Sequence, residues 1–318
     1  MGHLQAAPGP ELAIVVEGLV KRYGSVTAVD GISFTVARGE TFGLLGPNGA
    51  GKTTTLEIIE GLRKPDGGRV IVAGVDAIKE SRRARARMGV QLQYAGLFEL
   101  LTVAETIRLF ARFHRRRVDE RVLLERLQLV DKAKALVKTL SGGQRQRLSI
   151  ALALVNDPKV VFLDEPTTGL DPQARRNLWD VVRSIRDEGR TVVLTTHYMD
   201  EAEALCDRVA IIDHGRLVAL DTPQALIRQY APGVKVHVRP QDGAATALAD
   251  ALRSLPGVQR VSADAPDEVV LFSVDFEETI AALIRLGKEG AVRYQSLRVE
   301  APNLEDVFLQ LTGRRLRE

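Results

Sequence analysis

Residues 46–53 read Gly46-Pro47-Asn48-Gly49-Ala50-Gly51-Lys52-Thr53 and fit the pattern G-x-x-x-x-G-K-[ST]. An apolar stretch, 41–45, precedes this run, and a helix-like run, 54–60, follows it. In that context the glycines let backbone N–H groups curl around phosphates, Lys52 reaches the β- and γ-phosphate oxygens, and the Thr53 hydroxyl can ligate Mg²⁺. A glycine-rich turn with a surface lysine is the plainer alternative. The flanking strand and helix patterns favour a phosphate-binding loop at a helix N-terminus.

Two acidic residues, Asp164 and Glu165, directly follow the apolar and β-branched run 160–163. Such a run predicts a buried parallel strand, and open α/β sheets bind ligands at the carboxyl ends of their strands. We expect Asp164 to hold Mg²⁺ through water, and Glu165 to orient or deprotonate an attacking water. A helix N-cap before Thr167 and Thr168 is the alternative. The phosphate loop independently requires a metal-holding acid on a neighbouring strand, so the catalytic interpretation is preferred.

A third segment lies between these two and reads Leu140-Ser141-Gly142-Gly143-Gln144. The spacing S-x-x-Q is that of a capping box, and the apolar run 148–155 is predicted to belong to the capped helix. A capped helix start with two glycines exposes backbone N–H groups and the positive end of a dipole, which offers an anion site outward. We expect this segment not to touch the nucleotide held by its own chain. One copy of the protein then carries two half-sites.

These segments resemble, in order and spacing, the nucleotide-binding domain of ABC (ATP-binding cassette) proteins. The resemblance extends to Gly169-Leu170-Asp171 and Thr195-Thr196-His197 and covers about residues 11–230. It implies an α/β fold of the P-loop NTPase type, with a RecA-like core, an antiparallel β subdomain and a helical subdomain at about residues 90–157. It also implies an ATPase that uses ATP and Mg²⁺.

The resemblance implies a role for each matching residue. Tyr23 matches the aromatic residue that stacks on adenine, a contact worth about 1–3 kcal/mol by analogy with base stacking. His197 follows the predicted strand 191–194 and matches the switch residue near the γ-phosphate. The implied catalytic residues are Lys52, Gln93, Glu165 and His197, and the implied Mg²⁺ ligands are Thr53, Gln93 and Asp164. The implied ATP contacts are Tyr23, the run from Gly46 to Thr53, Thr54, Ser141, Gly142, Gly143, Gln144 and Asp171.

The loop glutamine of the family has two candidates here, Gln91 and Gln93. Spacing to Leu101-Thr102-Val103, which resembles the start of the helical subdomain, favours Gln93, and Gln91 remains the alternative. The loop 169–171 departs from the commonest family form at its first two residues. It keeps Asp171, whose implied role is contact across a dimer.

The mechanism implied by the resemblance is a head-to-tail homodimer. Each ATP lies between the phosphate loop of one copy and residues 141–144 of the other, so the γ-phosphate holds the dimer together and hydrolysis releases it. The chemistry is attack of water on the γ-phosphorus, and the protein contributes positioning and charge stabilisation.

The amino-acid composition indicates the cellular compartment of the protein and narrows the classes of partner that it could bind. The 318 residues suggest about two domains. The chain has 44 lysine and arginine residues and 41 aspartate and glutamate residues, which gives a net charge of +3. Positive and negative charges are too nearly balanced to indicate nucleic-acid binding. A single cysteine, Cys206, excludes an intrachain disulfide and fits a reducing cytosol. We find neither a signal peptide nor an apolar run long enough to span a membrane. We therefore expect a soluble cytoplasmic protein, peripheral on the cytoplasmic face of the membrane.

A second domain is predicted from residue 231 to residue 318, after a break at Ala231-Pro232-Gly233. Alternation at Val234, Val236 and Val238 predicts a strand. Further strands are expected at 269–274 and 292–299, and helices at 244–255, 277–286 and from 304 onward. The pattern favours a small α+β domain of the ferredoxin-like β-α-β-β-α-β kind. We expect the last helix to bury Leu304, Val307, Phe308 and Leu311.

The ending of the chain, residues 302–313, resembles the C-terminal extension of the daunorubicin and doxorubicin resistance group of export ATPases. Those proteins pair with a separately encoded membrane permease. The resemblance implies an exporter subunit for drug, antibiotic or lipid-like cargo, and the permease would recognise that cargo. The alternative is a soluble, non-transport ABC ATPase that acts as an ATP-dependent clamp or assembly factor. A single cassette with only a compact subdomain between Lys52 and Ser141 argues against chromosome-type and translation-type members.

Overall fold

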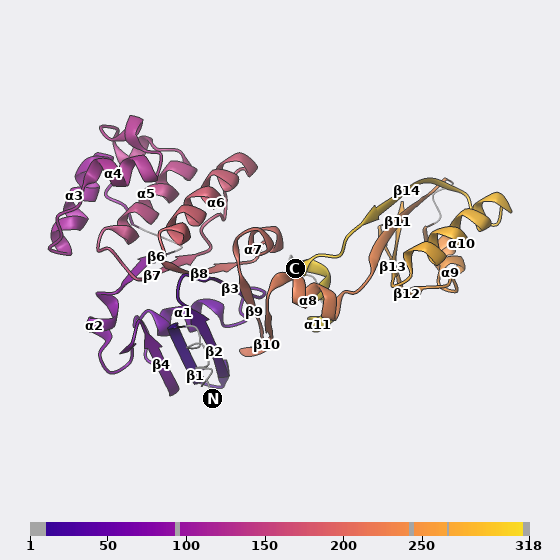
Figure 1. Cartoon of the computed structure of the whole chain (residues 1–318), viewed down its shortest axis with the longest axis horizontal. Helices are drawn as coiled ribbons and strands as arrows, with labels where there is room; N and C mark the ends of the chain where they lie inside the picture. Colours follow the sequence, from indigo (N-terminus) through magenta and orange to yellow (C-terminus); the bar gives the residue numbers. More distant parts are fainter. Residues whose placement is uncertain (1–10, 93–95, 242–244, 266, 314–318) are drawn as a thin grey trace, which may run out of the picture. The chain divides into compact units, whose positions relative to one another are not determined.

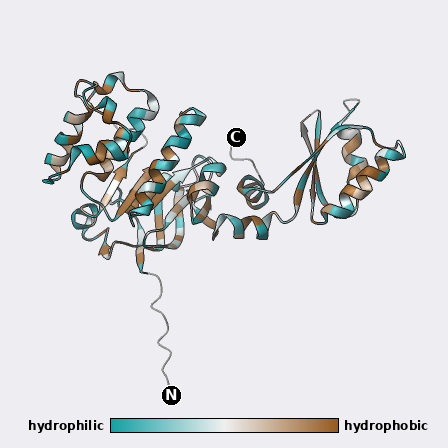
Figure 2. Cartoon of the chain, turned by 45° about the horizontal axis from the view of Figure 1, so that its top comes forward, coloured by the Kyte–Doolittle hydropathy of each residue, from teal (hydrophilic) through white to brown (hydrophobic). Residues whose placement is uncertain are grey.

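The computed structural model of the protein describes residues 11–92, 96–241, 245–265 and 267–313. The chain divides after Pro223 into two compact units (Figure 1). Each unit has a hydrophobic core of its own. Figure 2 shows apolar residues gathered along the strands and on helix faces, which is the pattern that burial of these two cores requires.

A six-stranded sheet with the order β10-β9-β3-β8-β7-β6 forms the centre of the larger unit. All neighbouring strands are parallel except β10, which is antiparallel to β9. Every residue of β3, β7 and β8 is buried, as expected for strands covered on both faces. The carboxyl ends of these three strands meet at one edge. The strands are β3 (Thr41–Leu45), β6 (Met88–Gln91), β7 (Val160–Asp164), β8 (Thr191–Thr196), β9 (Arg208–Asp213) and β10 (Arg216–Asp221).

A four-stranded antiparallel sheet, with the order β2-β1-β4-β5, accompanies the central sheet. Helix α1 (Lys52–Ile59) contacts this second sheet, and one core cluster includes Ile14, Leu56 and Phe162. Phe34 and Phe42 stack with ring centroids 5.1 Å apart and so join the two sheets. The predicted α/β fold with an antiparallel β subdomain is confirmed. The strands are β1 (Leu12–Tyr23), β2 (Val26–Ala37), β4 (Gly67–Val72) and β5 (Val75–Asp76).

A group of helices follows strand β6 in the chain, as the resemblance implies (Figure 1). Helix α3 begins with a complete capping box, in which Thr102 and Glu105 satisfy each other's backbone N–H groups. Two further helices flank the end of the central sheet, α6 after β7 and α7 after β8. The short helix α2 (Ser81–Arg85) precedes β6. The elements after β6 are α3 (Val103–Phe113), α4 (Glu120–Arg126), η1 (Val130–Lys132), η2 (Val137–Thr139), α5 (Gly142–Leu154), α6 (Pro172–Asp187) and α7 (Met199–Leu205).

The smaller unit contains a four-stranded antiparallel sheet with the order β12-β13-β11-β14. Strands and helices succeed one another as β-α-β-β-α-β, which together with this order is the ferredoxin-like arrangement predicted from the sequence. The sequence did not locate β12, in which four of the eight residues are polar. The elements are α8 (Pro223–Tyr230), β11 (Val234–Pro240), α9 (Ala245–Leu252), β12 (Val258–Ala265), β13 (Glu268–Ser273), α10 (Phe276–Lys288), β14 (Tyr294–Glu300) and α11 (Leu304–Thr312).

Helix α11 buries the apolar face predicted for it. Leu304, Val307 and Phe308 are fully buried, whereas Leu311 is only partly buried. The side chain of Asn303 caps the helix by accepting hydrogen bonds from the N–H groups of its first turn. Throughout the part of the chain that the structure describes, no helix combines the length and the apolar character that crossing a membrane requires.

Candidate functional site

The loop between β3 and α1 depends on two glycines. A Cβ at Gly46 would lie 2.2 Å from the carbonyl oxygen of Ile212, and a Cβ at Gly51 would lie 2.2 Å from that of Ala28. Both distances are too short for any side chain. Gly51 also has a φ of 101° at the N-cap of α1, where no side chain caps the helix. The N–H groups of the first turn are therefore left for a ligand.

Lys52 is the first residue of α1 and is buried, with only 5% of its surface exposed. Its ammonium group donates hydrogen bonds to the carbonyl oxygens of Gly46, at 2.8 Å, and Pro47, at 3.1 Å. Burial lowers the pKa of Lys52, and the negative charges of Glu165 and Asp164 oppose that shift. The loop is thus wrapped around a cation that faces two carboxylates.

A cavity of about 540 Å³ opens over this loop. It brings the loop together with two residues from other strand ends, Glu165 after β7 and His197 after β8. The hydroxyl-bearing Thr53 is exposed within it. The lining residues are Ala28, Asn48, Gly49, Ala50, Gly51, Lys52, Thr53, Thr54, Glu165, Thr168 and His197. The structure therefore gathers most of the predicted phosphate-loop residues with the predicted base and the predicted switch histidine.

The two acids after β7 have different surroundings. Asp164 is buried and accepts a 2.5 Å hydrogen bond from the Thr195 hydroxyl. Burial raises the pKa of Asp164, although the Thr195 hydrogen bond lowers it. Glu165 lies 3.5 Å from Nδ1 of His197 and accepts a hydrogen bond from the Thr168 hydroxyl at 3.1 Å. The hydrogen bond from His197 holds the pKa of Glu165 below its ordinary value despite partial burial. The pKa values of these two neighbouring carboxyl groups are thus shifted in opposite directions.

Glu165 has a left-handed backbone, with φ at 45°. Its N–H donates to the Thr195 hydroxyl at 2.9 Å, and the same hydroxyl bonds to Asp164. Thr195 therefore fixes both acids from the adjacent strand β8. The triplet Thr195-Thr196-His197 was recognised as a motif, but this role of Thr195 was not predicted from the sequence. The role of Thr168 was not predicted either, because its hydrogen bond to Glu165 depends on the turn after β7.

The predicted Mg²⁺ ligands Thr53 and Asp164 are oxygen donors of the kind that Mg²⁺ prefers. Mg²⁺ is held by few protein groups and completes its shell with water and phosphate oxygens. An exposed Thr53 hydroxyl beside Lys52 and a carboxylate at the end of β7 meet that requirement. Among the described residues, no group of three or more His, Cys, Asp or Glu side chains is placed to hold a metal ion. The residues present therefore fit Mg²⁺.

The loop glutamine is only partly covered by the structure. Gln93 lies outside the described residues. Gln91, the alternative, ends β6, is 1% exposed, and donates from Nε2 to the carbonyl oxygen of Leu92 at 2.7 Å. Its Oε1 has no hydrogen-bond partner among the described residues. Gln91 does not line the cavity over the phosphate loop.

Tyr23 and Asp171 lie in positions that their implied roles permit. Tyr23 ends β1 and is 42% exposed, with the cationic groups of Lys21 and Arg63 at 5.5 and 5.4 Å from its ring centroid. Tyr23 is not among the residues that line the cavity. Asp171 caps α6 by accepting a 2.8 Å hydrogen bond from the N–H of Ala174.

The predicted capping box at the start of α5 is confirmed. Ser141 Oγ accepts from the N–H of Gln144 at 3.3 Å, and the Gln144 side chain accepts from the N–H of Ser141 at 3.0 Å. Ser141 and Gly142 are exposed. A Cβ at Gly143 would lie 3.1 Å from Cβ of Ala174, so this turn packs closely on the start of α6. Among the described residues that line the cavity over the phosphate loop, none belongs to 141–144.

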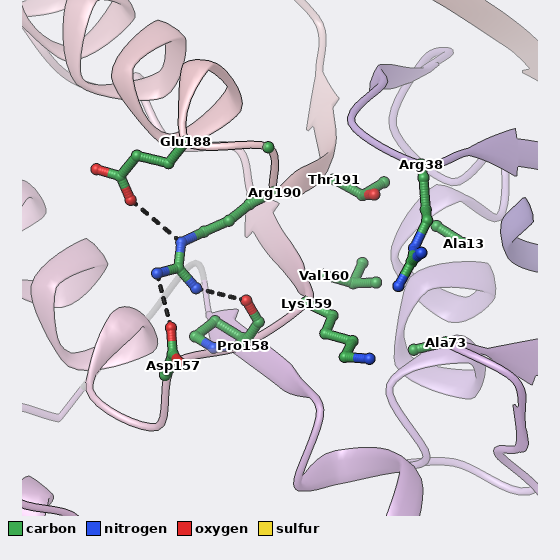
Figure 3. Close-up of a pocket in the computed structure, with 11 residues that line it drawn as sticks. Ala13, Arg38, Ala73, Asp157, Pro158, Lys159, Val160, Glu188, Arg190 and Thr191 are labelled. Atoms are coloured by element: carbon green, nitrogen blue, oxygen red, sulfur yellow. Dashed lines mark hydrogen bonds and ion pairs between the residues drawn. The ribbon is translucent and has the colours of Figure 1, made fainter. Parts of the chain in front are cut away.

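A second cavity, of about 420 Å³, lies at the opposite, amino-terminal ends of β7 and β8 (Figure 3). Arg190 forms ion pairs there with Asp157, at 2.8 Å, and Glu188, at 3.3 Å, and donates to the Pro158 carbonyl oxygen. Its charge is therefore neutralised within the cavity wall. This cavity carries no combination of nucleophile, base and phosphate loop among the described residues, so the chemistry belongs to the first cavity.

Comparison with known proteins agrees with this geometry. The model of the family described as ABC transporter matches residues 29–168. The chain is 43% identical to Nod factor export ATP-binding protein I of Ralstonia nicotianae over 98% of both chains. It is 40% identical to daunorubicin resistance ATP-binding protein DrrA3 of Streptomyces coeruleorubidus, over 97% of this chain and 99% of that one.

A solved structure gives the same result for the larger unit. The dimeric structure of MJ0796, a bacterial ABC transporter cassette, superposes with a TM-score of 0.60 at 28% identity. The match covers 98% of that cassette and 66% of this chain. The fold, the cavity over the phosphate loop and relatives at 43% and 40% identity over nearly the whole chain agree, and the chain therefore belongs to the ABC transporter family as an ATP-binding, ATP-hydrolysing subunit.

Proposed function

We propose that this protein is the ATPase subunit of an exporter and that two copies meet head to tail around two ATP molecules. The observation that carries the proposal is the separation of two half-sites within one chain. The cavity contains the phosphate loop, Glu165 and His197, whereas Ser141 and Gly142 stand exposed at a capped helix start outside it. A second copy supplies the missing half by symmetry.

The residues in and around the cavity take separate tasks in this proposal. Lys52 and the loop N–H groups hold the β- and γ-phosphates, and Tyr23 stacks on the adenine. Thr53 and Asp164 hold Mg²⁺, which neutralises phosphate charge when bound. Glu165, whose pKa is lowered, is ionised at neutral pH and orients or deprotonates the attacking water. His197 contacts the γ-phosphate from the end of β8.

Separate membrane permease subunits are the proposed partners of the dimer. Two relatives are named for export and for drug resistance, which supports drug, antibiotic or lipid-like cargo. Three exposed apolar side chains, Leu92, Phe98 and Leu100, lie in the segment that leads into α3, with exposed fractions of 44%, 49% and 76%. Exposed apolar groups close together in the chain are typical of a binding surface. We assign the permease contact to this segment.

A co-purification experiment tests the permease assignment. The tagged protein, expressed with the products of its neighbouring genes, should bring down an integral membrane protein from detergent extract. Leu100→Glu should reduce that recovery by about tenfold or more, because a charge would enter an apolar contact. The basal ATPase rate should stay unchanged. Val122→Glu, at a 49% exposed position on α4, is the matched control. Recovery of no membrane protein would favour a non-transport clamp.

The smaller unit is proposed to support the dimer. Four apolar side chains in it are exposed by more than 40%: Val274, Phe276, Ile284 and Val299. Surfaces of this kind favour self-association. Truncation after Tyr230 in a Glu165→Gln background should weaken ATP-driven dimerisation by about tenfold or more, measured by analytical ultracentrifugation. ATP binding to the truncated chain serves as the control for folding. An unchanged dimer dissociation constant would remove this role.

A further inference from the structure

A stack of four side chains runs from helix α6 into the nucleotide cavity. The guanidinium carbon of Arg175 lies 3.9 Å from the ring centroid of Tyr198. The Tyr198 ring lies 4.2 Å from the imidazole of His197, and His197 Nδ1 lies 3.5 Å from Oε2 of Glu165. We propose that Arg175 and Tyr198 are positioning residues, which hold the His197 ring so that Nδ1 faces Glu165 and the opposite ring edge serves the nucleotide.

The two ends of the stack belong to different parts of the site. Arg175 is in the first turn of α6, directly after the helix cap at Asp171. Tyr198 immediately precedes α7 and follows His197 at the end of β8. The stack therefore connects the loop 169–171, which would touch the second copy, with the catalytic cavity. A shift of α6 would therefore displace the His197 ring through Arg175 and Tyr198.

A second contact joins α6 to α7, one turn along α6 from Arg175. The indole N–H of Trp179 donates to Oε1 of Glu201 at 3.2 Å, and Glu201 is fully buried. Burial raises the pKa of Glu201, while hydrogen bonds to the carboxylate and the charge of Arg175 oppose that shift. Trp179 and Arg175 lie four residues apart and so share one face of α6. Helices α6 and α7 therefore pack against each other. The loop 169–171 precedes α6 and His197 precedes α7, so this packing links the two segments.

The contacts of Arg175 explain why an arginine is needed. Its Nε is buried and has no hydrogen-bond acceptor among the described residues, and its guanidinium forms a 3.5 Å ion pair with the largely exposed Asp200. The flat face against Tyr198 restrains the guanidinium together with this ion pair and the charge of Glu201. A lysine has a compact charge and cannot stack in this way. The Tyr198 ring thus contacts both a planar cation, at Arg175, and the imidazole of His197.

The test is a series of variants assayed for steady-state ATP hydrolysis. Tyr198→Leu should lower kcat by about 10- to 100-fold with KM nearly unchanged, because a misplaced catalytic group costs rate rather than nucleotide binding. Tyr198→Phe keeps the ring and should retain most of the activity. Arg175→Met should lower kcat by about 3- to 30-fold, the range that a cation–π contact supports. Arg183→Ala is the control, since Arg183 also joins α6 to α7, through the Ala204 carbonyl oxygen.

A double-mutant cycle separates positioning from general destabilisation. The inference rests on the proposed role of His197, so His197→Ala alone should lower kcat strongly. Adding Tyr198→Leu to His197→Ala should then cost less than about threefold more, because the two residues act through one interaction. Additive losses, or an unchanged kcat in Tyr198→Leu, would overturn the positioning role and leave that of His197 intact. Wild-type turnover in His197→Ala would instead overturn the role of His197 and the inference with it.

Discussion

Glu165→Gln is expected to slow ATP hydrolysis by about 10²–10⁴-fold, the range lost with a general base, while ATP binding is retained. Glu165 lines the cavity over the phosphate loop, and its carboxylate faces His197 and the Thr168 hydroxyl. The lowered pKa keeps this carboxylate ionised at neutral pH, and a glutamine can neither take a proton nor carry the charge. Single-turnover hydrolysis and equilibrium binding of a fluorescent ATP analogue measure the two quantities separately.

The isosteric change leaves the backbone geometry in place, since the Thr195 hydroxyl bonds to the N–H of Glu165 and not to its side chain. Glu188→Gln is a suitable control. Glu188 is a glutamate with ion-pair partners of its own, Arg126 and Arg190, but it lies at the second cavity. Its replacement should leave turnover near the unmutated rate. Turnover near that rate in Glu165→Gln would remove Glu165 from its assigned role.

Ser141→Arg is expected to abolish both ATP-driven dimerisation and hydrolysis while the fold and ATP binding persist. Ser141 is exposed and caps α5, so the loss of its cap costs about 1 kcal/mol, which a domain of this size tolerates. An arginine there blocks the helix start that would meet the γ-phosphate of the second copy. Light scattering with and without ATP measures the dimer, and thermal melting checks the fold.

Asp119→Arg provides a matched control for this change. Asp119 is likewise an exposed residue that caps a helix, α4, by accepting hydrogen bonds from the N–H groups of Arg121 and Val122. The substitution removes a cap and adds an arginine in the same helical region, but away from the start of α5. Dimerisation and turnover should survive it. Equal loss in the two variants would mean that a damaged cap, and not a blocked interface, causes the defect.

The sequence predicted the parts of the site that local patterns encode. Glycines at 46 and 51 are required by close backbone approach, and the S-x-x-Q spacing forms a capping box because both partners are three residues apart. The apolar runs before Asp164 and His197 are the buried strands β7 and β8. Parallel pairing then places their ends together without further information.

Contacts between side chains from distant elements were not predictable in this way. Thr195 bridges both acids through hydroxyl hydrogen bonds that the pairing of β7 with β8 does not by itself specify. Arg175 reaches Tyr198 because α6 packs beside α7 in a manner that one sequence does not specify. The observed helix ends also differ from the predicted ones. Helix α1 starts at Lys52, two residues before the predicted start, because the left-handed Gly51 is the N-cap. Strand β12 was missed because its polar residues weaken the alternating pattern.

The central claim is that one copy carries two half-sites, and mixing two inactive variants tests it most directly. Lys52→Ala destroys the phosphate loop, and Ser141→Arg destroys the other half. Each variant alone should be inactive. A mixed dimer regains one intact composite site, so an equimolar mixture should recover at most about a quarter of wild-type activity. Mixing either single variant with a chain that carries both substitutions forms no dimer with an intact site, so this control mixture should stay inactive. An inactive mixture, or full turnover by Ser141→Arg alone, would contradict the claim.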